Sequence, residues 1–168
     1  MGADELVPVL EKVDLFHDLD QKLLRRIAEA GREESFGPGE VVLVEGEEVS
    51  GFRAFSPKGV EMHVVLTGSA RASVDGVQHA VLGPGDYFGE LSLVDGGPRS
   101  AEVAAGDEGM TTFALAKWTF QELLDKHPEL AVPMLRVMAG RLRSLYAEVL
   151  AEGPVWEWPA KTERGTAK

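Results

Sequence analysis

A short stretch in the middle of the chain holds the residue types that bind a phosphate and a sugar together. It contains Gly89, Glu90 and, after a short gap, Arg99. The planar guanidinium of an arginine matches two phosphate oxygens at once, and a carboxylate accepts hydrogen bonds from a ribose 2′-OH. Gly89 has no Cβ, so a ligand can approach the backbone closely. One cation for the phosphate and one anion for the sugar predict a nucleotide-binding site.

The residues after Gly89 predict a helix N-terminus at the same place. Residues 89–93 have the pattern of the first turn of a short helix, which follows the turn Gly83-Pro84-Gly85. A helix N-terminus carries free N–H groups and a partial positive charge, so it attracts anions. This pattern favours a phosphate as part of the ligand.

This stretch resembles the phosphate-binding cassette of the cyclic nucleotide-binding domain family, in which Phe-Gly-Glu-(Leu/Ile)-Ala-Leu is followed, after a gap, by Pro-Arg-(Ala/Ser/Thr)-Ala. Here the two parts read Phe88-Gly89-Glu90-Leu91-Ser92-Leu93 and Pro98-Arg99-Ser100-Ala101. The likeness covers about residues 13–146. The resemblance implies that the following residues contact the ligand: Phe88, Gly89, Glu90, Leu91, Ser92, Pro98, Arg99, Ser100 and Ala101.

The sequence leaves the base of the nucleotide open. In the family, Thr or Ser at the position of Ser100 can favour guanine, yet bacterial activators of the catabolite type carry Arg-Ser-Ala and use cyclic AMP. We favour cyclic AMP over cyclic GMP because the chain is bacterial in style. Tyr146 lies where the family's C-terminal helix meets the base, so it could stack on a purine or simply pack on the barrel.

Composition sets limits on the class of protein. The chain has 168 residues, no cysteine and a formal net charge of −11. Disulfides, thiolate metal sites and cysteine nucleophiles are therefore excluded, and non-specific binding to nucleic acid is disfavoured. No apolar run is long enough to span a bilayer, and the acidic N-terminus lacks the pattern of a secretion signal. We expect a cytoplasmic protein that binds neither DNA nor membrane.

The pattern of apolar residues predicts a β-barrel or jelly roll with N-terminal helices and a long C-terminal helix, a mainly β fold with flanking helices. The helical segments are Asp4–Val13, Gln21–Ala30 (with Asp20 as N-cap and Gly31 as C′ residue), Lys117–Lys126 and Glu129–Leu150. The strand segments are Val41–Glu45, Met62–Leu66, Ala70–Val74, Gln78–Leu82, Ala101–Ala105 and Thr111–Ala116, with a hairpin turn at Asp75-Gly76.

Two segments, 153–168 and 48–62, fall outside this regular pattern of helices and strands. Residues 1–152 are predicted to form one cyclic nucleotide-binding domain, and residues 153–168 a flexible tail in which Trp156 and Trp158 could pin the chain to the domain. The segment 48–62 is longer than the crossing that the family has here, and its role is open.

The long C-terminal helix carries one apolar stripe. Its members are Leu135, Met138, Leu142, Leu145 and Val149. Such a stripe can pack on the protein's own barrel or form the seam of a homodimer, as the family often does. We expect a homodimer through this helix.

The main alternative is a metal-dependent enzyme with the cupin form of the jelly roll. Glu61 and His63 could in principle ligate a metal, but the four histidines contain no His-x-His pair of the cupin type. We therefore expect no metal site and no catalytic residues. A third hypothesis is an interaction module that has the fold but uses no ligand.

These observations predict a stand-alone regulatory sensor for a cyclic nucleotide. The chain after Leu150 is too short for the helix-turn-helix domain that transcription factors of the family carry there. We expect the nucleotide to order the cassette and draw the long helix over the base, so that the two states present different surfaces. The signal would then pass to an unidentified protein partner or through the protein's own oligomer.

Overall fold

The structure is a computed structural model that describes residues 1–49 and 60–151. The predicted flexible tail, with Trp156 and Trp158, lies outside the described residues, as does most of the long segment 48–62.

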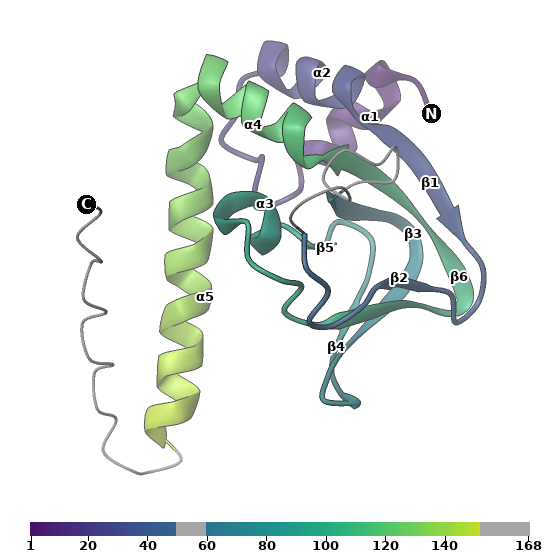
Figure 1. Cartoon of the computed structure of the whole chain (residues 1–168). Coiled ribbons are helices and arrows are strands. Elements are labelled where there is room, and N and C mark those ends of the chain that lie inside the picture. The colour runs from purple at the N-terminus through teal and green to yellow at the C-terminus, as the bar shows by residue number, and fades with distance from the viewer. Residues whose placement is uncertain (50–59, 152–168) are drawn as a thin grey trace, which may run out of the picture.

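The core of the fold is a curled antiparallel sheet of six strands (Figure 1). The strand order is β1-β6-β3-β4, with β2 paired to β6 and β5 paired to β3. The strands are β1 (Arg32–Phe36), β2 (Val41–Leu43), β3 (Glu61–Val74), β4 (Val77–Leu82), β5 (Tyr87–Phe88) and β6 (Glu102–Ala116). The predicted β-barrel with flanking helices is confirmed, and Asp75 and Gly76 form the hairpin turn between β3 and β4, both with positive φ.

Two long strands, β3 and β6, replace four short strands that the sequence predicted. Strand β3 includes both Met62–Leu66 and Ala70–Val74, and the pairing register with β6 shifts on either side of Gly68. A Cβ on Gly68 would lie 2.2 Å from the carbonyl oxygen of Gly109. The glycine thus permits a close crossing of β3 and β6 instead of ending the strand.

Strand β1 was not predicted, because its sequence Arg-Glu-Glu-Ser-Phe has almost no apolar alternation. It is held by pairing with the buried strand β6, from Arg32 opposite Ala114 to Phe36 opposite Met110. Tertiary pairing decides the conformation of such a segment, since strand propensity depends strongly on context.

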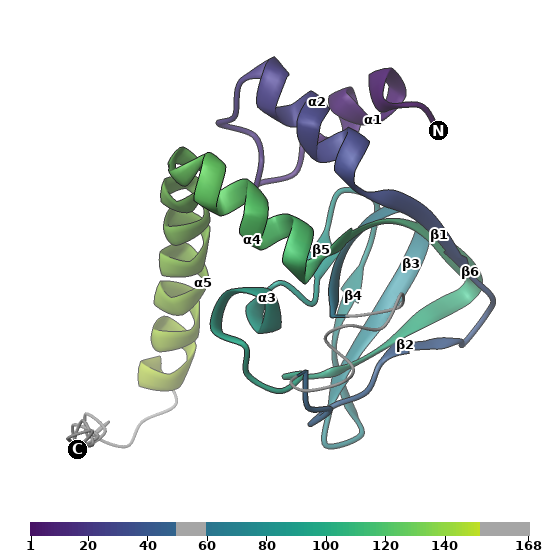
Figure 2. The ribbon, with the colours of Figure 1, turned by 45° about the horizontal axis from the view of Figure 1, so that its top comes forward.

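Helices cover one end of the sheet and one side of it (Figures 1 and 2). They are α1 (Ala3–Leu10), α2 (Gln21–Ala30), α3 (Leu91–Asp95), α4 (Lys117–Lys126), a 3-10 turn (Pro128–Leu130) and α5 (Ala131–Ala151). Helix α1 ends before the predicted Val13, and the long helix starts after the predicted Glu129 because Pro128 begins a 3-10 turn. Within the described residues no helix combines the length and apolar character needed to cross a membrane.

Helix α2 has the predicted bounds. The Asp20 side chain accepts a hydrogen bond from the Leu23 N–H at 2.8 Å, as expected of an N-cap. Gly31 ends the helix, but its φ of −101° is not left-handed, so the prediction of a C′ glycine was wrong. A Cβ on Gly31 would lie 2.2 Å from the ring of Phe113, and this packing is the reason for the glycine.

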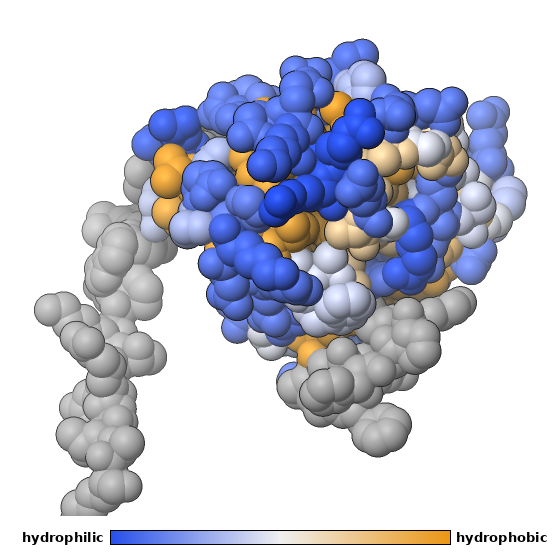
Figure 3. Space-filling view, turned by 90° about the horizontal axis from the view of Figure 1, so that it is seen from above, coloured by the Kyte–Doolittle hydropathy of each residue, from blue (hydrophilic) through white to orange (hydrophobic). Residues whose placement is uncertain are grey.

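The core has two parts, one on each face of the curled sheet. Along β3 the side chains alternate, so that Val64 packs under the helices with Leu24 and Phe113, whereas Val65 packs inside the barrel with Phe88. The outer face over α1 and α2 is mostly hydrophilic (Figure 3). The helices therefore bury their apolar sides against the sheet and leave the barrel interior to the strands.

Candidate ligand-binding site

Residues 88–101, here called the cassette, have as their second residue a glycine whose backbone has a left-handed conformation. Gly89 has a φ of 81° and connects β5 to α3. A Cβ at this position would lie 2.8 Å from the Glu61 carbonyl oxygen and 3.0 Å from Arg99 Nη1. Any other residue would disturb both groups, so the glycine is required for the geometry of Arg99.

Arg99 is buried, with 6% of its surface exposed, and its guanidinium is held by the backbone. Nη1 donates to the carbonyl oxygen of Gly89 and Nη2 to that of Glu61, each at 3.0 Å. A guanidinium has five N–H donors, so three remain for an anion. Burial lowers the pKa of Arg99, and the Glu61 and Glu90 carboxylates oppose that shift; arginine stays charged.

The second half of the cassette is held by hydrogen bonds to its first half and to residues 46 and 47. The Ser92 hydroxyl donates to the Pro98 carbonyl oxygen at 3.3 Å and closes the loop after α3. The Arg99 N–H donates to the Glu47 carbonyl oxygen at 3.0 Å, and the Gly46 N–H donates to the Arg99 carbonyl oxygen at 2.8 Å. These bonds place Arg99 before any ligand arrives, so little ordering is needed at this residue on binding.

Glu90 is buried but does not pair with Arg99. Its Oε1 accepts a hydrogen bond at 2.5 Å from Nη1 of Arg141 on α5. The Arg141 guanidinium also lies 4.5 Å from the centre of the Tyr87 ring, in cation–π geometry. Arg141 was not among the predicted site residues; the available signal was an arginine on the helix that the resemblance places over the ligand.

The cassette encloses a cavity of about 190 Å³. Most of the predicted site residues line it together: Phe88, Gly89, Glu90, Leu91, Ser92, Arg99, Ser100 and Ala101. Pro98 and Tyr146 are not among the lining residues: Pro98 accepts the Ser92 hydrogen bond, and Tyr146 lies half-buried on α5. Leu43, Ala72, Tyr87, Val103 and Arg141 complete the wall.

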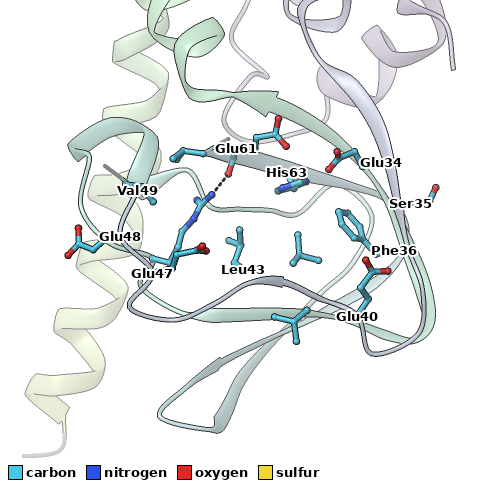
Figure 4. A pocket seen from close by; sticks show the side chains of 14 residues that line it. Glu34, Ser35, Phe36, Glu40, Leu43, Glu47, Glu48, Val49, Glu61 and His63 are labelled. Carbon is cyan, nitrogen blue, oxygen red and sulfur yellow. Dashed lines mark hydrogen bonds between the residues drawn. The ribbon is translucent and has the colours of Figure 1, made fainter. Parts of the chain in front are cut away.

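A larger cavity of about 560 Å³ is lined by side chains of β1, β2 and β3 (Figure 4). Arg99 and Leu43 line both cavities. Carboxylates are frequent in the larger one: Glu34, Glu40, Glu47, Glu48 and Glu61. The two cavities thus differ in charge, with a cation between them.

Glu61 and His63 lie close together, as the metal-dependent alternative required. Their ligand atoms and a carboxylate oxygen of Glu34 are all within 4.8 Å of one another. Both carboxylates accept hydrogen bonds from Arg32, which donates to Glu61 at 2.5 and 2.9 Å and to Glu34 at 2.7 Å. Arg32 is therefore the cation that is paired with both carboxylates in this structure.

Comparisons with known proteins agree with this geometry. Residues 33–127, more than half of the chain, match the family described as cyclic nucleotide-binding domain. The chain therefore belongs to this family. A similar protein is the CRP-like cAMP-activated global transcriptional regulator of Mycobacterium tuberculosis (strain ATCC 25618 / H37Rv), which is 27% identical over 144 residues, or 80% of this chain and 58% of the regulator.

Solved structures show the same fold. The N-terminal domain of a transcriptional regulator from Streptomyces coelicolor A3(2) has a TM-score of 0.64 and 31% identity, over 83% of this chain and 93% of that chain. The regulatory domain of Toxoplasma gondii PKA, crystallised with cAMP, has a TM-score of 0.60 and 28% identity, over 72% of this chain and 44% of that chain. This chain spans little more than half the length of the mycobacterial regulator.

Proposed function

We propose that this domain binds a cyclic nucleotide in the cassette cavity and acts as a regulatory sensor. The observation that carries the proposal is the arrangement of Arg99 and Glu90 in one cavity, with Arg99 fixed by two carbonyl oxygens and three of its donors left over. Arg99 would bind the cyclic phosphate, and Glu90 would accept a hydrogen bond from the ribose hydroxyl. Ser100 and Ala101 would complete the phosphate site.

Cyclic AMP is the proposed ligand in preference to cyclic GMP. The mycobacterial relative is named as cAMP-activated, and the Toxoplasma domain was crystallised with cAMP. The cassette residues would meet the phosphate and sugar, which the two nucleotides share, so the preference for cyclic AMP is supported by the ligand named for these similar domains. We also propose a cytoplasmic regulatory role without catalysis, in line with the regulatory relatives.

Helix α5 would carry the signal. Arg141 joins this helix to Glu90, the same carboxylate that would meet the ribose. A hydroxyl that hydrogen-bonds Glu90 changes the partners of Arg141, so ligand binding shifts the position of α5. Tyr146, one turn further along α5, would then approach the base.

The exposed stripe of α5 supports an output through a protein–protein contact. Leu135, Leu142 and Leu145 are 63%, 48% and 57% exposed, so this face does not pack on the protein's own barrel. Met138 is half-buried, at the edge of the helical core. We propose that this face forms a homodimer or docks an unidentified protein partner.

Calorimetric titration with cyclic AMP, cyclic GMP and 2′-deoxy cyclic AMP tests the proposal. We expect saturable binding of cyclic AMP, weaker binding of cyclic GMP, and a loss of affinity for the deoxy analogue that shrinks in Glu90→Gln. Equal binding of the deoxy analogue would remove Glu90 from the sugar site. No binding of any of the three would favour a ligand-free interaction module.

A further inference from the structure

The larger cavity contains a cluster of side chains that the cyclic nucleotide site does not use. Glu34 on β1 and Glu61 and His63 on β3 all line this cavity, and their ligand atoms lie within 4.8 Å of one another (Figure 4). Glu61 is 4% exposed and His63 is 3% exposed. Two glutamates and a histidine on neighbouring parts of one curled sheet form a set of oxygen and nitrogen donors.

His63 is oriented as metal-binding histidines are. Its Nδ1 is 3.0 Å from the Thr112 hydroxyl, and in the described part of the chain Nε2 has no hydrogen-bond partner. In the tautomer in which Nδ1–H donates to the Thr112 hydroxyl, this hydrogen bond fixes the ring and Nε2 keeps its lone pair for a ligand.

Arg32 is the cation paired with this cluster, and its side chain is more exposed to solvent than that of Glu61. It bonds both carboxylates, but its own side chain is 42% exposed, whereas that of Glu61 is 6% exposed. Arg32 can therefore turn towards solvent, where its charge is hydrated, while Glu61 stays in the barrel. A cation that enters through the cavity would replace it as the partner of the two carboxylates.

We propose that Glu34, Glu61 and His63 form a binding site for a divalent first-row transition-metal ion, with Zn²⁺ as the best match, and that Arg32 is displaced when the ion binds. Imidazole together with carboxylates suits zinc and its neighbours, whereas magnesium and calcium prefer oxygen ligands alone. Three protein ligands leave a further coordination position, which would face the cavity of about 560 Å³.

The first test uses Co²⁺ and Zn²⁺ alone as probes of the full chain. We expect one Zn²⁺ per chain by calorimetry, the visible absorption of tetrahedrally bound Co²⁺, and no comparable affinity for Mg²⁺. Arg32→Met should bind Zn²⁺ about tenfold more tightly or better, because the carboxylates lose their resident cation. His63→Gln should bind it at least about tenfold more weakly.

The matched control is His127→Gln, because His127 pairs with Glu129 at an exposed site that could bind zinc adventitiously. This variant should bind Co²⁺ as the wild type does. Histidine ¹⁵N NMR of the wild type needs no variant: Zn²⁺ should shift the His63 ring signals. Shifts confined to His17, His79 and His127, or absence of saturable binding in both wild type and Arg32→Met, would overturn the proposal.

Discussion

At the residue scale, Arg99 contributes to the stability of the cassette and to the proposed anion binding, and the two contributions can be measured separately. Its bonds to the Gly89 and Glu61 carbonyl oxygens hold the cassette against β3, and its side chain also lines the cassette cavity. Removing the side chain therefore affects the protein's stability modestly and its anion affinity strongly.

We expect Arg99→Ala to weaken cyclic AMP binding by at least about 2 kcal/mol, because a buried charge-assisted contact is lost. The domain should still fold. Calorimetry gives the affinity, and circular dichroism gives the fold. Arg71→Ala is the matched control, since Arg71 pairs with the exposed Asp107 away from the cassette. An Arg99→Ala protein with wild-type affinity would move the phosphate site elsewhere.

Gly89→Ala tests the close approach at the start of the cassette. A left-handed alanine costs about 1–2 kcal/mol, and the collision with the Glu61 carbonyl oxygen should add about 1–3 kcal/mol. Gly76→Ala has a similar φ of 73° and nothing within 4 Å of the new Cβ, so it should show the backbone cost alone. Equal losses of unfolding free energy in the two variants would contradict the steric argument.

His63 makes stability depend on pH in a defined direction. Its pKa is about 3 in the fold and 6.5 when unperturbed, so between these values the unfolded chain binds the extra proton. The contribution of His63 to the unfolding free energy should therefore be constant above about pH 7 and fall on acidification, by up to about 1.4 kcal/mol per pH unit. Urea unfolding with a chelator present measures this. His63→Gln should lack this part of the fall; an identical pH profile would refute the assignment.

At the scale of elements, α5 is attached in two different ways. Its first half packs on the helical core through Met134, next to the buried Leu130 of the preceding turn, and Arg136 bonds Asp18 at 2.9 Å. The second half has exposed apolar side chains and is joined to the cassette through Arg141. The side chain of Arg141 therefore links the second half of the helix to the cassette.

The substitution Arg141→Ala should detach the second half of α5 from the cassette. In the ligand-free protein we expect faster amide hydrogen exchange in residues 140–147 and unchanged exchange near Met134, because Arg141 loses its contacts with Glu90 and Tyr87, whereas Met134 is held by the helical core. Arg143→Ala, which changes an exposed arginine of the same helix, is the control. If both variants exchange alike, Arg141 does not hold the helix.

An element could be predicted when the residues that determine it are close together in the sequence. The bounds of α2 were predictable because a local cap and apolar periodicity agree, and the cassette was predictable because its residues are contiguous. Three other features depend on segments far apart in the chain: strand β1, the continuous strand through Gly68, and the ion pair between Arg141 and Glu90. No local pattern contains such information, and a polar strand such as β1 has no pattern of its own.

At the scale of the whole molecule, the exposed face of α5 predicts self-association. Leu142→Glu should lower the proportion of dimer measured by sedimentation, because burying a charge in an apolar seam is unfavourable. Val81→Glu is the control: Val81 is 61% exposed on β4, far from the helix in sequence. A dimer that survives Leu142→Glu, or a wild type that is monomeric with and without nucleotide, would show that the face serves another partner.

The β3–β4 hairpin offers a practical use for the domain. Its two-residue turn, Asp75-Gly76, has both residues at positive φ, and nothing lies within 4 Å of a Cβ built on Gly76. Exposed turns of this kind tolerate insertions. A fluorescent protein inserted there, with a second one fused beyond α5, would convert any movement of that helix into a change in energy transfer. The domain would then serve as a genetically encoded indicator, and its response would report helix motion in living cells.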